Sequence, residues 1–383
     1  MSLLLKEDKL IFVGLIKVTI DRQVLRNNFR EIKRLLPPSV SVGAVVKSQA
    51  YGHGMVECAR VFAQEGARFL VVSLIDEGIT LRESGLEEPV LLMGGIWPQE
   101  AQDCIRYGLT PVISGLQPLK ALSRAATELN QEARVHIKVD TGMGRLGVPM
   151  EEWREFLDEA LSYPGVVLEG LMSHFSVADS PENSDVAYTM QQMEVFKAIV
   201  EEVRKKLPHL KWIHLANSAA TLQLPQTHWN LVRPGLGLYG GLRIPQINLQ
   251  EAMEVSSRIL HIKRVPGGRF LSYGRAFRTT RETLVAVVPV GYALGYLRSL
   301  SNRGEMLVRG ERAPVIGRVC MDLTLLDVTH IPKVELGDPV ILMGGKGKQR
   351  ITVFEVAQWM DTITYEVFCI LGGSHPGQRE YVN

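Results

Sequence analysis

The sequence predicts an α/β fold, a (β/α)8 barrel of the TIM type followed by a mostly-β C-terminal domain. From about residue 16 to 245, short apolar runs alternate with longer stretches of helical period, as expected for βα units. About eight such units can be counted, which favours a closed barrel over an open sheet. After about residue 250 the chain changes to short β-rich runs separated by glycine, proline or charged turns.

We therefore expect three parts: an N-terminal extension (residues 1–15), the barrel (16–248) and the C-terminal domain (249–383). The candidate barrel strands are continuous apolar runs, which is typical of strands covered on both faces. They lie at residues 42–46, 69–74, 90–93, 111–114, 135–139, 168–172, 212–215 and 231–232. Residues 185–206 predict a helix, because apolar side chains recur there at a spacing of three to four: Val186, Met190, Met193, Phe196, Val200 and Val203.

In the C-terminal domain only residues 353–360 have a strong helical pattern. The remaining candidate elements are β-rich and bounded by turn residues. These predicted strands lie at residues 258–265, 283–290, 305–308, 314–319, 323–328 and 339–343.

Composition excludes several classes of function. The formal net charge of +2 comes without a basic run, so we expect no nucleic-acid partner. We also expect no membrane association, because no segment has the roughly 18 apolar residues that a span needs, and no secretory signal. The four cysteines are widely spaced, without zinc-ligand spacing or disulfide density, which predicts reduced thiols, a cytoplasmic protein and no metal site.

Residues 45–54, Val-Val-Lys-Ser-Gln-Ala-Tyr-Gly-His-Gly, place Lys47 at the end of the first barrel strand. Burial favours the neutral, nucleophilic form of a lysine amine, and such an amine can bind an aldehyde as a Schiff base. The alternative for Lys47 taken alone is a side chain that extends to solvent from a strand end.

Other polar residues follow the later strands, and in such a barrel all carboxyl ends of the strands lie on one rim. The loops 140–145 and 233–237 are rich in glycine, so their backbone N–H groups could approach an anion closely. An amine facing a phosphate site indicates pyridoxal 5'-phosphate (PLP) as cofactor. The candidate rim residues are Lys47, Asp140 to Arg145, His174, Asn217, Ser218, Arg233, Gly235 and Gly237.

Each of these residues also has an ordinary interpretation. His174 could be a structural histidine, and Ser218 could simply cap the helix that follows it. Lys138 is unusual, because a lysine inside a strand needs a partner or a modification. Residues 235–240, Gly-Leu-Gly-Leu-Tyr-Gly, match a dinucleotide-binding fingerprint, but no helix is predicted after them, so we do not favour an NAD-dependent enzyme.

Seven further blocks resemble motifs of the alanine racemase family, the fold-type III PLP enzymes, in family order along almost the whole chain. They are Lys-Val-Asp-Thr-Gly-Met-Gly-Arg-Leu-Gly (138–147), Ser-His-Phe (173–175), Ala-Asn-Ser-Ala (216–219), Val-Arg-Pro-Gly (232–235), Ser-Tyr-Gly-Arg (272–275), Val-Pro-Val-Gly-Tyr (288–292) and Cys-Met-Asp (320–322). The resemblance implies interconversion of L-alanine and D-alanine with PLP as cofactor.

The resemblance also implies roles for single residues. Lys47 would bind PLP and act as the acid/base group on one face of the substrate. Tyr273 would act on the other face, supplied by the second subunit of a head-to-tail homodimer with two composite sites. His174 would lie behind Tyr273 and link it toward Arg233, so the resemblance implies that His174 and Arg233 are catalytic residues as well. The implied cofactor contacts are Tyr51, Ser218 and Gly235 at the phosphate, Arg233 at the pyridine nitrogen, and His174 and Asn217 beside them.

For the substrate, the resemblance implies that Arg145 and the backbone N–H of Met321 bind the carboxylate of a small amino acid. Lys138 is similar to a lysine that is carbamylated in many members of the family. A carbamylated Lys138 would be an anion that orients Arg145, which would explain how this lysine can be buried.

The chain departs from the family pattern at Ser48-Gln49, at Leu294 and in the segment 369–378. These positions affect substrate entry, so racemisation of serine or of a broader set of amino acids is an alternative on the same catalytic frame. Two other classes are a PLP decarboxylase acting on diamino acids, for which Cys320 is the only hint, and a non-catalytic PLP-binding protein.

Overall fold

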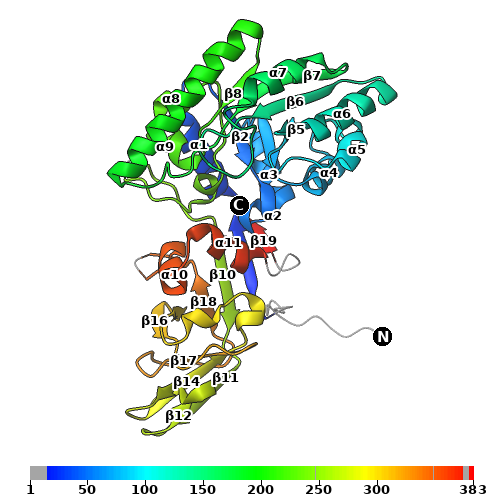
Figure 1. The fold of residues 1–383 in the computed structure, drawn as a ribbon. Coiled ribbons are helices and arrows are strands. Elements are labelled where there is room, and N and C mark those ends of the chain that lie inside the picture. The colour runs from blue at the N-terminus through cyan, green and yellow to red at the C-terminus, as the bar shows by residue number, and fades with distance from the viewer. Residues whose placement is uncertain (1–14, 246, 348, 374–378) are drawn as a thin grey trace, which may run out of the picture. The chain divides into compact units, whose positions relative to one another are not determined.

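The computed structural model describes residues 15–245, 247–347, 349–373 and 379–383, and the described chain divides into two compact units (Figure 1). One unit comprises residues 21–252 and Asn383, and the other comprises the described residues of 15–20 and 253–382. We placed residues 16–20 with the barrel, whereas the structure places them in the second unit, because they form a strand of its sheet. The predicted N-terminal extension lies outside the described residues, apart from Leu15.

The unit of residues 21–252 is built on eight parallel strands. They are β2 (Ser41–Val45), β3 (Phe69–Val72), β4 (Val90–Leu92), β5 (Leu109–Ile113), β6 (Ala133–Lys138), β7 (Val166–Met172), β8 (Trp212–His214) and β9 (Leu231–Val232). They run in the order β8-β7-β6-β5-β4-β3-β2-β9. Arg233 N donates to Ala216 O over 3.0 Å beside the two end strands, so the sheet is nearly closed. The predicted (β/α)8 barrel and its eight strands are confirmed.

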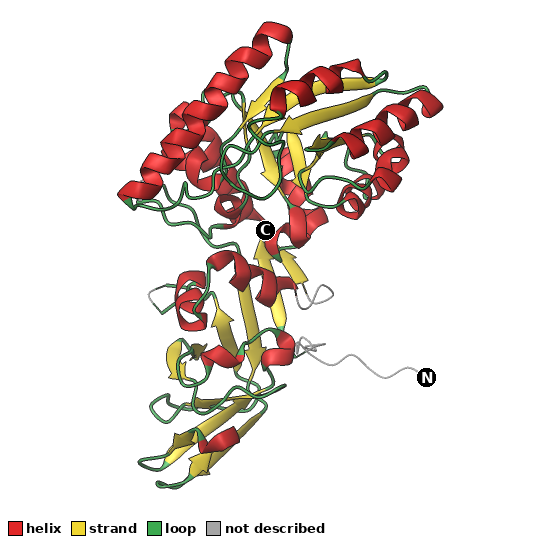
Figure 2. Ribbon diagram, viewed as in Figure 1, coloured by secondary structure: helices red, strands yellow, loops and turns green. Residues whose placement is uncertain are grey.

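Helices alternate with these strands along the chain and lie outside the sheet (Figure 2). Their bounds are α1 (Arg22–Arg34), α3 (Met55–Gln64), α4 (Ile75–Glu83), α5 (Ala101–Arg106), α6 (Leu116–Leu129), α7 (Trp153–Ser162), α8 (Asn183–Lys206) and α9 (Ser218–Gln223). α1 shows why they form: Asp21 caps its first turn, and its apolar residues recur on one buried face, where Phe29 stacks on Phe62 of α3.

The helix predicted at residues 185–206 is present as α8, but its buried face differs from the prediction in the first half. Phe196, Val200 and Val203 are buried as expected. Val186, however, is 44% exposed, while the polar Gln192 is only 1% exposed. α8 has 24 residues, yet no helix in the described part of the chain is long and apolar enough to cross a membrane.

The second unit is mostly β, as predicted. Its sheets have the strand orders β16-β15-β18-β10-β1-β19, β11-β14-β17 and β12-β13. The strands are β1 (Lys17–Asp21), β10 (Met253–Arg258), β11 (His261–Val265), β12 (Phe270–Leu271), β13 (Phe277–Arg278), β14 (Thr283–Val288), β15 (Glu305–Val308), β16 (Glu311–Pro314), β17 (Thr324–Asp327), β18 (Pro339–Met343) and β19 (Arg379–Val382). Two helices accompany them, α10 (Val353–Met360) and α11 (Thr364–Gly373).

Two predicted strands of this unit were wrong in detail, and the helix α11 was not predicted. The strand predicted at 258–265 is two strands, because the chain changes sheet after Arg258. The strand predicted at 314–319 ends at Pro314, whose ring cannot donate to a ladder. α11 was missed because its β-branched and aromatic residues have weak helix propensity. Burial of Val367, Phe368 and Leu371 stabilises α11 instead.

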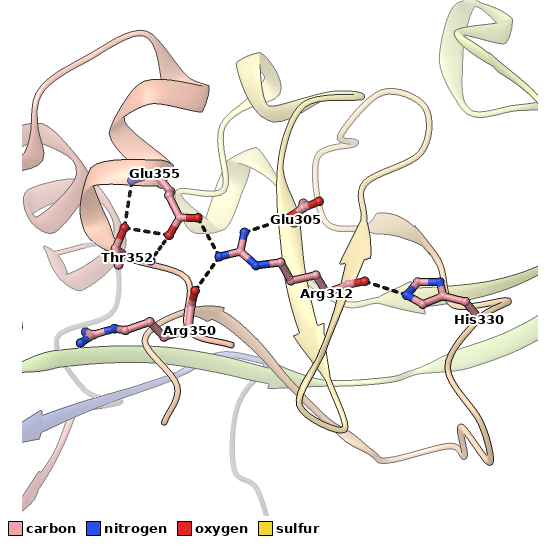
Figure 3. Close-up of polar contacts among 6 residues, drawn as sticks. All are labelled: Glu305, Arg312, His330, Arg350, Thr352 and Glu355. Atoms are coloured by element: carbon pink, nitrogen blue, oxygen red, sulfur yellow. Dashed lines mark hydrogen bonds and ion pairs between the residues drawn. The ribbon is translucent and has the colours of Figure 1, made fainter. Parts of the chain in front are cut away.

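A cluster of charged groups connects the β15-β16 hairpin with α10 (Figure 3). Arg312 donates to Glu305 Oε2 (2.8 Å), to Glu355 Oε1 (2.7 Å) and to Arg350 O (2.7 Å). Glu355 also accepts the N–H of Thr352 at the start of α10. Burial would raise the pKa of Glu355, but the hydrogen bonds from Thr352 and Arg312 hold it below its ordinary value. The cluster therefore joins three segments of this unit.

Candidate active site

The structure places five of the predicted site segments at the carboxyl ends of barrel strands. Lys47 follows β2, and the loop 140–145 follows β6. His174 follows β7, Ser218 follows β8, and Arg233 follows β9 directly. Since all eight strands are parallel, these groups lie on one rim of the barrel.

Lys47 opens a single turn of left-handed helix, α2 (Lys47–Tyr51). Ser48, Gln49, Ala50 and Tyr51 have φ values of 52°, 55°, 53° and 54°. A left-handed conformation costs about 1–2 kcal/mol for each non-glycine residue, so four in succession need strong support. Strain of this kind is typical of functional sites, where the surrounding structure holds it.

Several hydrogen bonds supply that support. Ala50 N donates to Val46 O over 2.8 Å, and Gly54 N donates to Gln49 O over 2.7 Å. Glu77 Oε1 on α4 accepts the N–H of Ser48 over 2.5 Å. The half-buried Lys47 is thus attached to a turn that is held from within and by a neighbouring helix.

Tyr51, Ser218 and Gly235 come together behind this turn. Ser218 Oγ accepts the N–H of Gly235 (2.7 Å) and that of Gly237 (3.2 Å). A Cβ atom on residue 235 would lie 2.5 Å from Tyr51 Oη, so only glycine fits there. Two hydroxyls and backbone N–H groups in so small a space form a set of donors suited to an anion.

Asn217, not Ser218, caps α9: its Oδ1 accepts the N–H of Ala220 over 3.0 Å. The capping role that we considered for Ser218 therefore belongs to its neighbour. A contact between Asn217 and a cofactor stays a prediction.

Arg233 is 3% exposed and has only uncharged acceptors among the described residues. Its Nη1 donates to His214 Nδ1 (2.7 Å). Its Nη2 faces three acceptors, Ser173 O at 3.0 Å, Leu215 O at 3.2 Å and His174 Nδ1 at 3.4 Å. Burial lowers the pKa of Arg233 to about 9, so the guanidinium is still charged at neutral pH. Within the described chain its Nε–H has no partner.

The site contains more cationic groups around Lys138, the last residue of β6. Lys138 is 4% exposed, and burial together with the charges of Arg233, Arg145 and Lys47 lowers its pKa to about 8. Burial and the same surrounding charges hold the pKa of His174 well below its ordinary value, so His174 is neutral and can accept from Arg233. The structure thus brings these five predicted residues into one electrostatic neighbourhood.

Tyr273 and Met321 belong to the second unit. Tyr273 is 70% exposed and lies in a short 3-10 turn, Tyr273–Arg275, while Met321 is 54% exposed. Tyr273 lines a hollow of about 510 Å³ whose other lining residues are Gly274, Tyr292, Arg298, Arg318 and Val319. The pairing of Tyr273 with Lys47 stays a prediction.

Sequence reasoning missed several polar residues behind the site. His136 and His214 lie on barrel strands, fully buried, with His136 Nδ1 2.7 Å from His214 Nε2. Their only signal in the sequence was a histidine inside an apolar strand pattern. Glu77 and Gln192 gave no signal, because exposed helix positions have the same residue types.

The family model described as alanine racemase, N-terminal domain, matches residues 20–243, and the one described as alanine racemase, C-terminal domain, matches residues 252–378. The alanine racemase of Halothermothrix orenii is 40% identical over 369 residues, 95% of this chain and 96% of that protein. The alanine racemase of Syntrophobacter fumaroxidans is 42% identical over 359 residues, 93% of this chain and 95% of that protein.

A solved structure extends the similarity to the fold. The alanine racemase of Clostridium difficile 630 has a TM-score of 0.89 at 32% identity, covering 97% of this chain and 96% of that one. Two family models together span both units, and relatives with about 40% identity cover nearly the whole chain. The chain belongs to the alanine racemase family.

Proposed function

We propose that this protein interconverts L-alanine and D-alanine with PLP as its cofactor. The observation that carries the proposal is the similarity to alanine racemases at about 40% identity across both units. The arrangement on the barrel rim supports the proposal independently, because the amine of Lys47, a set of donors for an anion and the buried guanidinium of Arg233 all lie there.

The residues on the rim fit PLP. Tyr51 Oη, Ser218 Oγ and the N–H of Gly235 would hold the phosphate, because the hydroxyl of Ser218 bonds the N–H of Gly235 and the absence of a Cβ at Gly235 leaves the hydroxyl of Tyr51 beside them. Arg233 Nε, which has no partner among the described residues, would donate to the pyridine nitrogen. The Lys47 amine would hold the aldehyde group. When bound, PLP withdraws electrons from the substrate Cα and so makes its proton removable.

Arg233 limits how strongly the ring can withdraw electrons. A guanidinium with a pKa of about 9 keeps its own proton at neutral pH and leaves the pyridine nitrogen unprotonated. A carboxylate in its place would favour protonation of that nitrogen. Arg233 would therefore restrict the chemistry to exchange of the Cα proton, which suits a racemase.

Inversion at Cα needs one group that removes a proton on one face and another that returns a proton on the opposite face. Lys47 Nζ would serve one face and Tyr273 Oη the other. His174 would help to hold Arg233, and Arg145 and the N–H of Met321 would bind the substrate carboxylate.

We propose that Tyr273 comes from the second subunit of a head-to-tail homodimer with two composite sites. The 70% exposed side chain of Tyr273 in its own unit is consistent with a role at a surface that another subunit covers. Subunit mixing tests this: Lys47→Ala and Tyr273→Phe are each expected to be inactive, but a mixed dimer has one intact site. Random mixing should restore about a quarter of wild-type activity, since about half of the dimers are mixed and each has one good site of two.

Lys138 is the proposed site of carbamylation. With a pKa of about 8, a substantial fraction of its amine is neutral near pH 8, and the neutral amine attacks CO2, forming an N–C bond and releasing one proton. The anion formed would compensate the surrounding charges of Arg233 and Arg145. In ¹³C-bicarbonate, we expect a carbamate signal by NMR that Lys138→Met lacks.

We also propose a cytoplasmic location, since the cysteines, two of which are buried, are free thiols in the described chain.

The Tyr273→Phe variant tests the two-base proposal itself. It should lose turnover in both directions while keeping bound PLP and its visible absorbance, because the cofactor contacts lie on the barrel. Unchanged racemisation by this variant would overturn the role of Tyr273.

A further inference from the structure

Helix α8 contacts the two loops that carry predicted site residues, through two side chains that are one turn apart. Tyr188 Oη donates to Gly142 O over 2.8 Å. Gln192 Oε1 accepts from both N and Oγ of Ser176 (3.1 Å each), and Gln192 Nε2 donates to His174 O over 3.2 Å. Residues four apart on a helix lie on the same face, so one face of α8 holds both loops.

The burial of Gln192 indicates that its side chain does more than fill space between α8 and the loop after β7. Its side chain is 1% exposed, and an apolar residue would fill such a position without the cost of burying a carboxamide. All three of its hydrogen bonds go to residues 174–176, so the carboxamide serves the loop rather than the helix. Gly142 is in close contact as well: a Cβ there would lie 2.3 Å from Tyr188 Oη.

The loop after β7 contacts Arg233 directly, and the loop after β6 is connected to it through the loop after β7. Ser173 O and His174 Nδ1 both face Arg233 Nη2. Ser173 Oγ and Thr141 Oγ1 are 2.8 Å apart, which joins the loop after β7 to the loop after β6. A displacement of either loop would therefore move acceptors of the buried guanidinium.

We propose that Gln192 and Tyr188 are positioning residues of the active site. Gln192 holds His174 and Ser173 against Arg233, and Tyr188 holds the loop that leads to Arg145. The inference rests on the proposed function, because it assigns the two loops to catalysis and to carboxylate binding respectively.

Hydrogen exchange of the protein without PLP tests the contact without reference to activity. Gln192→Met removes all three hydrogen bonds at nearly the same side-chain length. Amide hydrogen exchange in residues 173–178 should become at least about tenfold faster, because the hydrogen bond from the N–H of Ser176 to Gln192 is lost. Gln191→Met is the matched control, since Gln191 is exposed on the same helix and makes none of these bonds. It should leave the exchange of residues 173–178 unchanged.

Kinetics of the PLP-loaded enzyme separate the two roles. Gln192→Met should lower kcat per bound PLP by about 10- to 100-fold, because misplaced groups cost that much. Tyr188→Phe removes one hydroxyl from a half-exposed ring, and so should fold even if Gln192→Met does not. It should raise KM for alanine by roughly 3- to 10-fold with little change in kcat.

A purely structural role predicts a different result: lower thermal stability and fewer active molecules, with kcat per bound PLP and KM both unchanged. That result, or exchange in residues 173–178 equal to that of Gln191→Met, would overturn the inference. If the wild-type holoenzyme does not interconvert alanine, the proposed function fails, and the exchange measurement still decides whether α8 holds these loops.

Discussion

Arg233 donates to His214 Nδ1 over 2.7 Å, and this bond determines where the protons lie in a buried pair of histidines. Because His214 Nδ1 accepts, the proton of this imidazole is on Nε2, which donates to His136 Nδ1. His136 then carries its proton on Nε2, for which the described residues offer no acceptor. Burial and the charge of Arg233 lower the pKa of His136 to about 3, and burial likewise lowers that of His214, so neither imidazole adds charge.

The bond predicts different effects for two substitutions of His214. His214→Phe leaves Arg233 Nη1 without this acceptor. The lost hydrogen bond should weaken the binding free energy of PLP by about 1–3 kcal/mol and lower kcat. His214→Asn places an amide oxygen where Nδ1 lies and should retain most of the activity. Titration of the protein with PLP and steady-state kinetics check both. Equal losses in the two variants would argue against the acceptor role.

At the proposed phosphate site, added volume at Gly235 should impair PLP binding. Gly235→Ala puts a Cβ 2.5 Å from the hydroxyl of the buried Tyr51 and should abolish or strongly weaken PLP binding. Gly237→Ala is the comparison, because its Cβ would meet only side chains at 3.5 Å or more. It should bind PLP within about threefold of wild type. Absorbance titration measures both, and normal binding by Gly235→Ala would contradict the proposed phosphate site.

The left-handed turn after Lys47 should depend on Glu77. Its Oε1 accepts the N–H of Ser48, while Oε2 accepts those of Ser73 (2.8 Å) and Leu74 (3.1 Å) at the start of α4. Glu77→Ala should lower the free energy of unfolding by about 1–2 kcal/mol, because the N–H groups of Ser73 and Leu74 lose their acceptor. PLP incorporation should fall as well, because the turn that carries Lys47 loses a support. Asp76→Ala, an exposed acidic residue of the same helical turn, should leave incorporation intact.

Lys138 should make the stability of the PLP-free protein depend on pH in CO2-free buffer. Its pKa of about 8 in the folded chain is below the value of about 10.4 for an unperturbed lysine. Between these two values the unfolded chain holds a proton that the folded chain has lost, so this residue makes the free energy of unfolding rise with pH. Below pH 8 the full cost of burying the charged amine remains.

Urea unfolding at several pH values measures this effect. Lys138→Met should flatten the rise between about pH 8 and pH 10, whereas Lys120→Met, at a half-exposed lysine on α6, should retain it. An unchanged rise in Lys138→Met would mean that another group causes it.

The sequence was sufficient to predict the barrel, because its strands are continuous apolar runs. Their pattern depends on burial alone, and β3 and β4 show it clearly. Rim residues such as Lys47 and Arg233 followed from the rule that parallel strands end on one side. The family resemblance was needed for Tyr273, whose position after a short strand has no local signal.

Tertiary contacts decided what the sequence could not predict. The first half of α8 buries Gln192 instead of the apolar Val186, because the loop after β7 offers partners for a carboxamide. The left-handed turn after Lys47 contradicts the local preference of its four residues, and bonds such as that from Glu77 maintain it. α11 forms from weak helix formers because its apolar face is buried.

Chiral chromatography of the PLP-loaded protein tests the central claim most directly. The protein is incubated separately with L-alanine and with D-alanine, and with L-serine and L-lysine for comparison. We predict that both alanine reactions reach the same equal mixture of enantiomers, with much slower conversion of the other two amino acids. Failure to form D-alanine from L-alanine by a protein with bound PLP would contradict the proposed function.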